Sequence, residues 1–139
     1  MSKFSTKLKA RTYECDMYGH VNNAVYLQYC EAARIELLNA IGYSLKDLMH
    51  KKIMMPIVRV EIDFKKQIFA DEEIWVTVEW AFEKNTSVTF RHEIVKMQNN
   101  ELAAIAHVTW VTVDAKGKPI RFPAEMKNKF LQLIRDTDD

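Results

Sequence analysis

The feature that most constrains this chain is a predicted helix over residues 23–41 whose side chains are apolar on almost every side. Asn23 is the expected cap at its start, and Gly42 follows its end, where a left-handed residue is favoured. A helix on a protein surface keeps a polar face, whereas a helix that is apolar all round is typical of a buried position. We therefore expect the rest of the chain to wrap around it. The apolar residues are Ala24, Val25, Leu27, Tyr29, Cys30, Ala32, Ala33, Ile35, Leu37, Leu38 and Ile41.

The segments that follow this helix have the period-two alternation of strands. Apolar and polar residues alternate over 57–66, 73–82, 86–97 and 102–113, and a shorter alternation covers 7–13. We expect the four later strands to form an antiparallel meander whose apolar face curls around the helix, which is an α+β architecture. Two further helices are expected, a short one begun by Ser44 with Asp47 as its capping-box partner, and a C-terminal one from Pro123 to about Arg135.

Length and composition predict one domain over residues 1–139, because a chain of this size is large enough for a single core. Three glycines and three prolines leave little material for linkers. The formal net charge is +1 with 28% charged residues, so neither nucleic acid nor an anionic membrane is an expected partner.

Cysteine usage and the N-terminus add further expectations. Cys15 and Cys30 show neither CxxC spacing nor a Cys/His array, so we expect reduced thiols and no metal site. The first residues lack the apolar run of a signal peptide, and no stretch approaches the roughly 18 apolar residues of a membrane span. These observations predict a soluble, cytoplasmic protein.

A polar loop leads directly into the long helix. Taken alone, an acidic residue at Asp16 is more often a turn or capping residue than a catalytic one. Here it belongs to a longer pattern: Asp16-x-x-Gly19-His20-Val21-Asn22-Asn23-x-x-Tyr26, then Glu31-x-Ala33-Arg34, and later Ile62-x-Phe64 followed by Asp71.

This pattern resembles the hotdog-fold acyl-CoA thioesterases of the 4-hydroxybenzoyl-CoA thioesterase-like family, over about residues 8–120. The pair Asn22-Asn23 resembles the corresponding residues of the long-chain acyl-CoA thioesterase branch. This likeness favours a fatty-acyl substrate over an aryl one. Gln67-Ile68 departs from the family, whose members usually have a proline-containing turn there. The resemblance implies a hotdog fold, no metal or cofactor, and a dimer or tetramer with the site between subunits.

The resemblance also implies roles for individual residues. Asp16 would attack the thioester carbonyl carbon or activate a water that attacks, and these two routes stay open. The backbone amide of Asn23 would stabilise the oxyanion at the helix start. His20 is a second acid/base candidate, although a loop histidine is more often a hydrogen-bonding or packing residue. Gly19, Asn22 and Tyr26 would contact the substrate. Asn22 could equally well serve only to shape the turn. Arg59 and Lys65 are candidates to bind the phosphates of coenzyme A. The simpler alternative is that both are solvent-exposed charges without a binding role.

Other roles for nearby residues are less favoured. A cysteine nucleophile at Cys15 is disfavoured because no oriented base is evident. Glu31 and Arg34 are expected to form a structural pair on the helix. A hotdog hydratase would carry an Asp/His pair on the helix, which has neither residue. The remaining alternatives to an acyl-CoA thioesterase are an acyl carrier protein thioesterase and a non-catalytic module that binds acyl thioesters.

Overall fold

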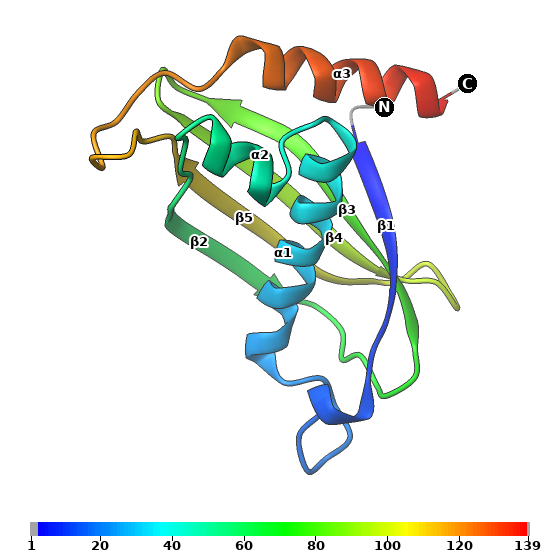
Figure 1. Ribbon diagram of the computed structural model, residues 1–139. Coiled ribbons are helices and arrows are strands. Elements are labelled where there is room, and N and C mark those ends of the chain that lie inside the picture. Colours follow the sequence, from blue (N-terminus) through cyan, green and yellow to red (C-terminus); the bar gives the residue numbers. More distant parts are fainter. Residues whose placement is uncertain (1–2, 139) are drawn as a thin grey trace.

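A single antiparallel sheet of five strands forms the framework of the computed structural model, which describes residues 3–138 (Figure 1). The strand order is β1-β3-β4-β5-β2, and the long helix α1 lies across one face of the sheet. The strands are β1 (Lys3–Lys9), β2 (Ile57–Phe64), β3 (Glu73–Glu83), β4 (Ser87–Lys96) and β5 (Leu102–Val111). The helices are α1 (Asn23–Ala40), α2 (Leu45–His50) and α3 (Ala124–Asp138), with a 3₁₀ turn at Thr12–Glu14.

The sheet confirms the α+β architecture and corrects part of its expected topology. Only β3, β4 and β5 form a meander, because β2 pairs with β5 and not with β3. Residues 65–72 carry the chain from the end of β2 across to β3, and the amides of Lys65 and Lys66 both donate to the carbonyl of Ala103. Alternation shows which face a residue occupies but not which strand is its neighbour, so the pattern alone did not reveal this crossover.

The first strand lies earlier than expected. β1 covers residues 3–9 and pairs with β3 from Lys3 opposite Glu79 to Lys9 opposite Glu73. The predicted end of that strand is instead the 3₁₀ turn, in which the Glu14 carboxylate accepts the amide N–H of Arg11 at 2.7 Å. A local hydrogen bond of this kind competes with strand pairing, and here it ends the strand before the turn.

Helix α1 confirms the long predicted helix, but it is buried on one side only. Tyr26, Tyr29, Cys30, Ala33, Arg34, Leu37 and Leu38 are buried, whereas Ile35 on the opposite side is 41% exposed. The cap at its start is Asn22, not Asn23, because the Asn22 side-chain oxygen accepts the amide N–H of Ala24 at 2.9 Å. Gly42 has φ +82, as expected for the residue after the helix.

The expected pair of Glu31 and Arg34 is not formed. Arg34 Nη1 lies 3.1 Å from His92 Nε2, and His92 Nδ1 lies 2.9 Å from the carbonyl of Thr77 on β3. Glu31 remains exposed, while Arg34 passes inward to the sheet. Helical spacing correctly places the two residues near each other but does not show that a buried histidine across the interface binds the arginine.

Helix α3 closes one end of the core. Phe130 is fully buried, and its ring contacts those of Trp80 and Phe90 with centroids 5.8 and 6.2 Å away. Within residues 3–138, the helices are all too short or too polar to cross a membrane.

Candidate active site

The loop before α1 is a tight turn organised by Asp16. The amide of Gly19 donates to the carbonyl of Asp16 at 3.0 Å, and the amide of Tyr18 donates to Asp16 Oδ1 at 2.9 Å. Gly19 has φ +82, a conformation that glycine adopts without strain. Asp16 therefore shapes the turn with one carboxylate oxygen, while no hydrogen bond to Oδ2 occurs within the described residues.

The first backbone amides of α1 differ in whether they have a hydrogen-bond acceptor. The amide of Ala24 donates to the Asn22 side chain and that of Val25 to the Asn22 carbonyl, both at 2.9 Å. The amide of Asn23 has no hydrogen-bond partner among residues 3–138. An unpaired N–H at a helix N-terminus, where the helix dipole is positive, is suited to bind a developing negative charge.

Asp16 and Asn23 line one groove of about 400 Å³. Its walls come from the 16–20 loop, the start of α1, and the segment that follows β2. Asp16, Asn23, His20, Tyr26 and Lys65 all contribute to it, so the fold brings five sequence-predicted residues together. Gly19 and Asn22 belong to the same loop without lining the groove. The other lining residues are Val21, Phe64, Lys66 and Gln67.

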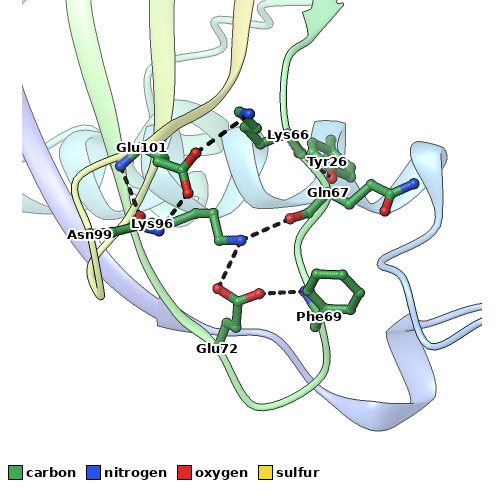
Figure 2. Close-up of polar contacts among 8 residues, drawn as sticks. All are labelled: Tyr26, Lys66, Gln67, Phe69, Glu72, Lys96, Asn99 and Glu101. Atoms are coloured by element: carbon green, nitrogen blue, oxygen red, sulfur yellow. Dashed lines mark hydrogen bonds and ion pairs between the residues drawn. The ribbon is translucent and has the colours of Figure 1, made fainter.

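The wall opposite the loop is held by a buried ion pair (Figure 2). Lys96 Nζ donates to the carbonyl of Gln67 at 3.1 Å and lies 3.3 Å from Glu72 Oε2. Glu72 Oε1 in turn accepts the amide N–H of Phe69 at 2.9 Å. On the groove side, the Tyr26 hydroxyl donates to the carbonyl of Lys66 at 3.4 Å, and burial raises the pKa of this hydroxyl. Residues 66–69 are therefore fixed from both sides.

His20 is positioned by packing. Its ring meets that of Phe69 edge-on with centroids 5.0 Å apart, and its backbone carbonyl accepts the amide of Asp16 at 2.8 Å. His20 thus connects the loop to the wall that Lys96 holds. The His20 ring thus packs against the opposite wall, as loop histidines commonly do, and it also lines the groove.

Arg59 lies away from this groove. It is exposed on β2, where it forms an ion pair with Glu61. Of the two predicted phosphate ligands, only Lys65 lines the groove in one chain, and it is joined there by Lys66.

Cys15 precedes Asp16, but its environment disfavours a thiolate. Desolvation and the neighbouring carboxylate of Asp16 raise the pKa of the thiol, and the sulfur lies 3.5 Å from the carbonyl of Arg11. A raised thiol pKa lowers the fraction of nucleophilic thiolate at neutral pH.

The sequence pattern includes Phe64 and Gln67 but did not predict that they line the groove, and it gave no sign of the ion pair of Lys96 and Glu72 behind them. Phe64 belongs to the sequence pattern as a strand residue, and the structure adds that its ring meets that of Tyr26 edge-on with centroids 5.0 Å apart. Lys96 ends a strand and looks solvated in the sequence. Residues 3–138 contain no cluster of three or more histidine, cysteine or acidic side chains that could hold a metal ion.

Comparison with known proteins gives consistent matches. A family model described as the thioesterase-like superfamily matches residues 10–130. The chain is 31% identical over 139 residues to a chloroplastic acyl-acyl carrier protein thioesterase of Arabidopsis thaliana, a match that covers 99% of this chain and 73% of the plant protein. It is 26% identical over 131 residues to the long-chain acyl-CoA thioesterase FadM of Escherichia coli strain K12, covering 94% of this chain and 98% of that protein.

Solved structures share the fold. The 1,4-dihydroxy-2-naphthoyl-CoA thioesterase Slr0204 from Synechocystis superposes with a TM-score of 0.87 at 19% sequence identity, over 95% of this chain and 98% of that chain. At this level of identity the likeness concerns the fold.

Proposed function

This chain belongs to the thioesterase-like superfamily, and on that premise we propose that it hydrolyses a fatty-acyl-CoA thioester to the free acid and coenzyme A in the groove beside Asp16. Thioester hydrolysis is the reaction class of its relatives. The observation that carries the proposal is that one groove is lined by Asp16 and by Asn23, whose amide N–H has no hydrogen-bond partner among the described residues.

In the proposed reaction the thioester carbonyl oxygen accepts the amide N–H of Asn23, where the α1 dipole stabilises the growing negative charge. Asp16 either attacks the carbonyl carbon, giving a mixed anhydride that water then cleaves, or removes a proton from a water that attacks. In both routes the carbon–sulfur bond breaks and the thiolate leaves. A thiol with an ordinary pKa of about 8.5 is a good leaving group, so no strong general acid is needed.

The other predicted site residues support binding and positioning. Gly19 and Asn22 hold the loop and the cap that orient Asp16 and the Asn23 amide. Tyr26 and His20 line the groove and contact its opposite wall. Lys65, with Arg59 supplied by another subunit, would meet the phosphates of coenzyme A, since both side chains are exposed.

We further propose that the protein assembles as a homodimer or homotetramer. Strand β2 is an edge of the sheet, and Val58, Val60 and Phe64 on it are exposed by 59%, 40% and 48%. A long apolar edge strand is prone to pair with another chain. Assembly along this edge would bring a second subunit close to the groove, whose wall includes Phe64. A cytoplasmic location and a role in lipid metabolism are part of the same proposal.

The main alternative is a substrate carried by acyl carrier protein. It is favoured by the 31% identity to the plant acyl-acyl carrier protein thioesterase, which exceeds the 26% identity to FadM. Released thiol measured on matched acyl-CoA and acyl carrier protein thioesters separates the two substrates. Binding of these thioesters without turnover of any of them would favour a non-catalytic module.

The central experiment is Asp16→Asn, assayed with the acyl-CoA panel. We expect kcat to fall by about two orders of magnitude or more, because the carboxylate is lost as base or nucleophile. The amide oxygen can still accept the Tyr18 N–H, so the fold is retained. Glu36→Gln, an exposed acid elsewhere on α1, is the matched control and should keep full activity. Full activity of Asp16→Asn would remove Asp16 from the mechanism.

A further inference from the structure

The turn that carries Asp16 is a short hairpin that leads directly into α1. The amide of Asp16 donates to the carbonyl of His20 at 2.8 Å, and the amide of Asn22 donates to the carbonyl of Glu14 at 2.9 Å. Asp16 therefore lies on one strand of this hairpin, and Asn23 directly follows the other strand. Because Asn22 is the cap of α1, the carbonyl of Glu14 helps to fix where the helix begins.

The side chain of Glu14 ties the same hairpin to the body of α1. Its Oε1 atom accepts the hydroxyl of Tyr29 at 2.8 Å and the amide N–H of Arg11 at 2.7 Å. Tyr29 lies on α1, the helix whose first residue is Asn23. Glu14 thus contacts the helix twice, through its carbonyl at the cap and through its carboxylate further along. One residue therefore links the segment that carries Asp16 to the helix that carries the proposed oxyanion donor.

The hydrogen bond between Tyr29 and Glu14 is largely shielded from water. Tyr29 is only 4% exposed, and Glu14 is half-buried. Burial, followed by the hydrogen bond to Glu14, raises the pKa of the Tyr29 hydroxyl, so this group stays protonated and remains a donor near neutral pH. A hydrogen bond to a carboxylate is stronger than one between neutral groups. Loss of either side chain should therefore loosen the contact between the hairpin and α1.

This pair lies outside the groove where hydrolysis is proposed. Glu14 and Tyr29 do not line that groove, and both line a separate groove of about 410 Å³ between α1 and β1. β1 and β2 are the opposite edges of the sheet, so a subunit paired along β2 would adjoin the other edge. The reacting thioester beside Asp16 would therefore lie against neither side chain. Any effect of the pair on hydrolysis must act through the hairpin.

We propose that Glu14, held by Tyr29, is a positioning residue that sets the separation between the Asp16 carboxylate and the Asn23 amide. The inference rests on the proposed function, because it assigns how the two reacting groups of that site are held. Misplacement of a reacting group by about 1 Å can lower a rate about a hundredfold. A residue that positions such groups without touching the substrate changes kcat, whereas a residue that only binds the substrate changes KM.

The first test removes a single hydroxyl group. Tyr29→Phe keeps the buried ring, and we expect kcat on acyl-CoA thioesters to fall about tenfold while KM stays within about twofold. Tyr13→Phe is the matched control, because Tyr13 lines the same groove but is 83% exposed, and it should keep full kcat. Full kcat in Tyr29→Phe would overturn the proposal. A change in KM alone would also overturn it, since that result indicates a contact with the substrate.

Substitutions of Glu14 test its carboxylate directly. Glu14→Gln keeps an oxygen that accepts both donors and should retain most of kcat, whereas Glu14→Leu should lose about tenfold or more. The double variant Glu14→Leu with Tyr29→Phe should be no slower than Glu14→Leu alone, because both changes break the same hydrogen bond. Losses that multiply would contradict the proposal. Glu73→Gln is the control, since Glu73 lines the same groove but pairs with Lys7.

Amide hydrogen exchange tests the geometry without turnover. Tyr29→Phe should speed exchange of the Asn22 amide, which donates to the Glu14 carbonyl, about tenfold. Amides of the central strand β4 should exchange at the unaltered rate, which separates local loosening from a general loss of stability. Unchanged exchange at Asn22, or an equal rise at Asn22 and in β4, would refute the positioning role. If Glu14→Leu does not fold, Tyr29→Phe still decides the matter by rate and by exchange.

Asp16→Asn separates this proposal from the catalytic one. Normal kcat in the Glu14 and Tyr29 variants, together with an inactive Asp16→Asn, would end the positioning role and leave the thioesterase proposal intact. If the unaltered protein hydrolyses no thioester, the thioesterase proposal fails, while exchange of the Asn22 amide still decides whether Glu14 fixes the start of α1.

Discussion

At the scale of single residues, Asn22 and Asn23 act through different groups: Asn22 through its side chain and Asn23 through its backbone amide. The Asn22 side chain caps α1, while the backbone N–H of Asn23 is left without a partner in the described chain. The proposed oxyanion donor is thus a main-chain group, which most substitutions at position 23 retain. Only a change that removes the N–H itself tests the role.

Proline at position 23 makes that test. Proline is favoured at the first position of a helix, and Asn22 has φ −62 and ψ 140, which suits a residue before proline. Asn23→Pro should therefore fold and lower kcat by about a hundredfold, the usual effect of losing one oxyanion donor. Asn23→Ala keeps the N–H and should stay near full activity. Equal rates for the two variants would exclude the amide from catalysis.

His92 gives a prediction for stability. Burial, followed by the neighbouring Arg34, lowers the pKa of His92 to about 3, so the folded protein keeps this ring neutral where the unfolded chain, near 6.5, would protonate it. Above pH 6.5 the ring is neutral in both the folded and the unfolded chain, so it does not change the free energy of unfolding with pH. As the pH falls from 6.5 toward 3, only the unfolded chain binds the proton, and the free energy of unfolding falls by about 1.4 kcal/mol per pH unit. Urea unfolding at pH 7.5, 6.0 and 5.0 measures this slope. His92→Gln should flatten it, and an unchanged slope in that variant would assign the effect to other groups.

At the scale of elements, the crossover segment 65–72 matters most, because it forms one wall of the groove. Strand alternation predicted the residues of β2 and β3 well, and the hotdog fold expected from the loop motif is confirmed. The crossover could not be predicted in the same way, since its conformation depends on Lys96 and Ala103, far along the chain. The loop motif predicted that Asp16, Asn23 and Tyr26 belong to one site, and these residues do line one groove. The place of Phe64 and Gln67 in that groove depends on the sheet topology, which the motif does not contain.

Removal of the Lys96 ammonium group, which lies behind this wall, should lower the stability of the fold. Lys96→Met leaves Glu72 buried without its ion-pair partner, and loss of one member of such a pair typically costs about 3 kcal/mol. We expect that loss in urea unfolding, together with a lower kcat/KM, because Gln67 and Phe69 are released. The double variant Lys96→Met with Glu72→Gln should recover much of the stability, since glutamine still accepts the Phe69 N–H. Additive losses in the double variant would contradict this coupling.

At the scale of the whole molecule, a single chain leaves two features incomplete: one side of α1 is exposed, and within residues 3–138 the edge strand β2 pairs on one side only, with β5. The sequence predicted a helix wrapped on nearly every side, and one sheet covers only half of that surface. A second subunit could cover the part of the α1 surface that the sheet leaves exposed. It would also explain why Arg59, a predicted phosphate ligand, lies outside the groove of its own chain.

A charge on the edge strand tests this assembly. Val60→Lys places a cation on an exposed position of β2, a common way in which proteins prevent edge pairing. We expect light scattering to show a dimer or tetramer for the unaltered protein and a monomer with reduced activity for the variant. Asn85→Lys, at the exposed turn between β3 and β4, adds the same charge away from this edge and is the control. A monomeric unaltered protein would refute the oligomer proposal.

The pairing of β2 with β5 also sets an order of events during synthesis. Residues 57–64 leave the ribosome early, yet their partners are residues 104–110, so β2 must wait for about a third of the chain before it can pair. Pairing between such distant segments is slow compared with local hairpins. A nascent chain that ends before residue 96 would therefore carry Asp16 and α1 without the Lys96 contact that holds the opposite wall. Pulse-labelled amide exchange during refolding should show β2 protected no earlier than β5.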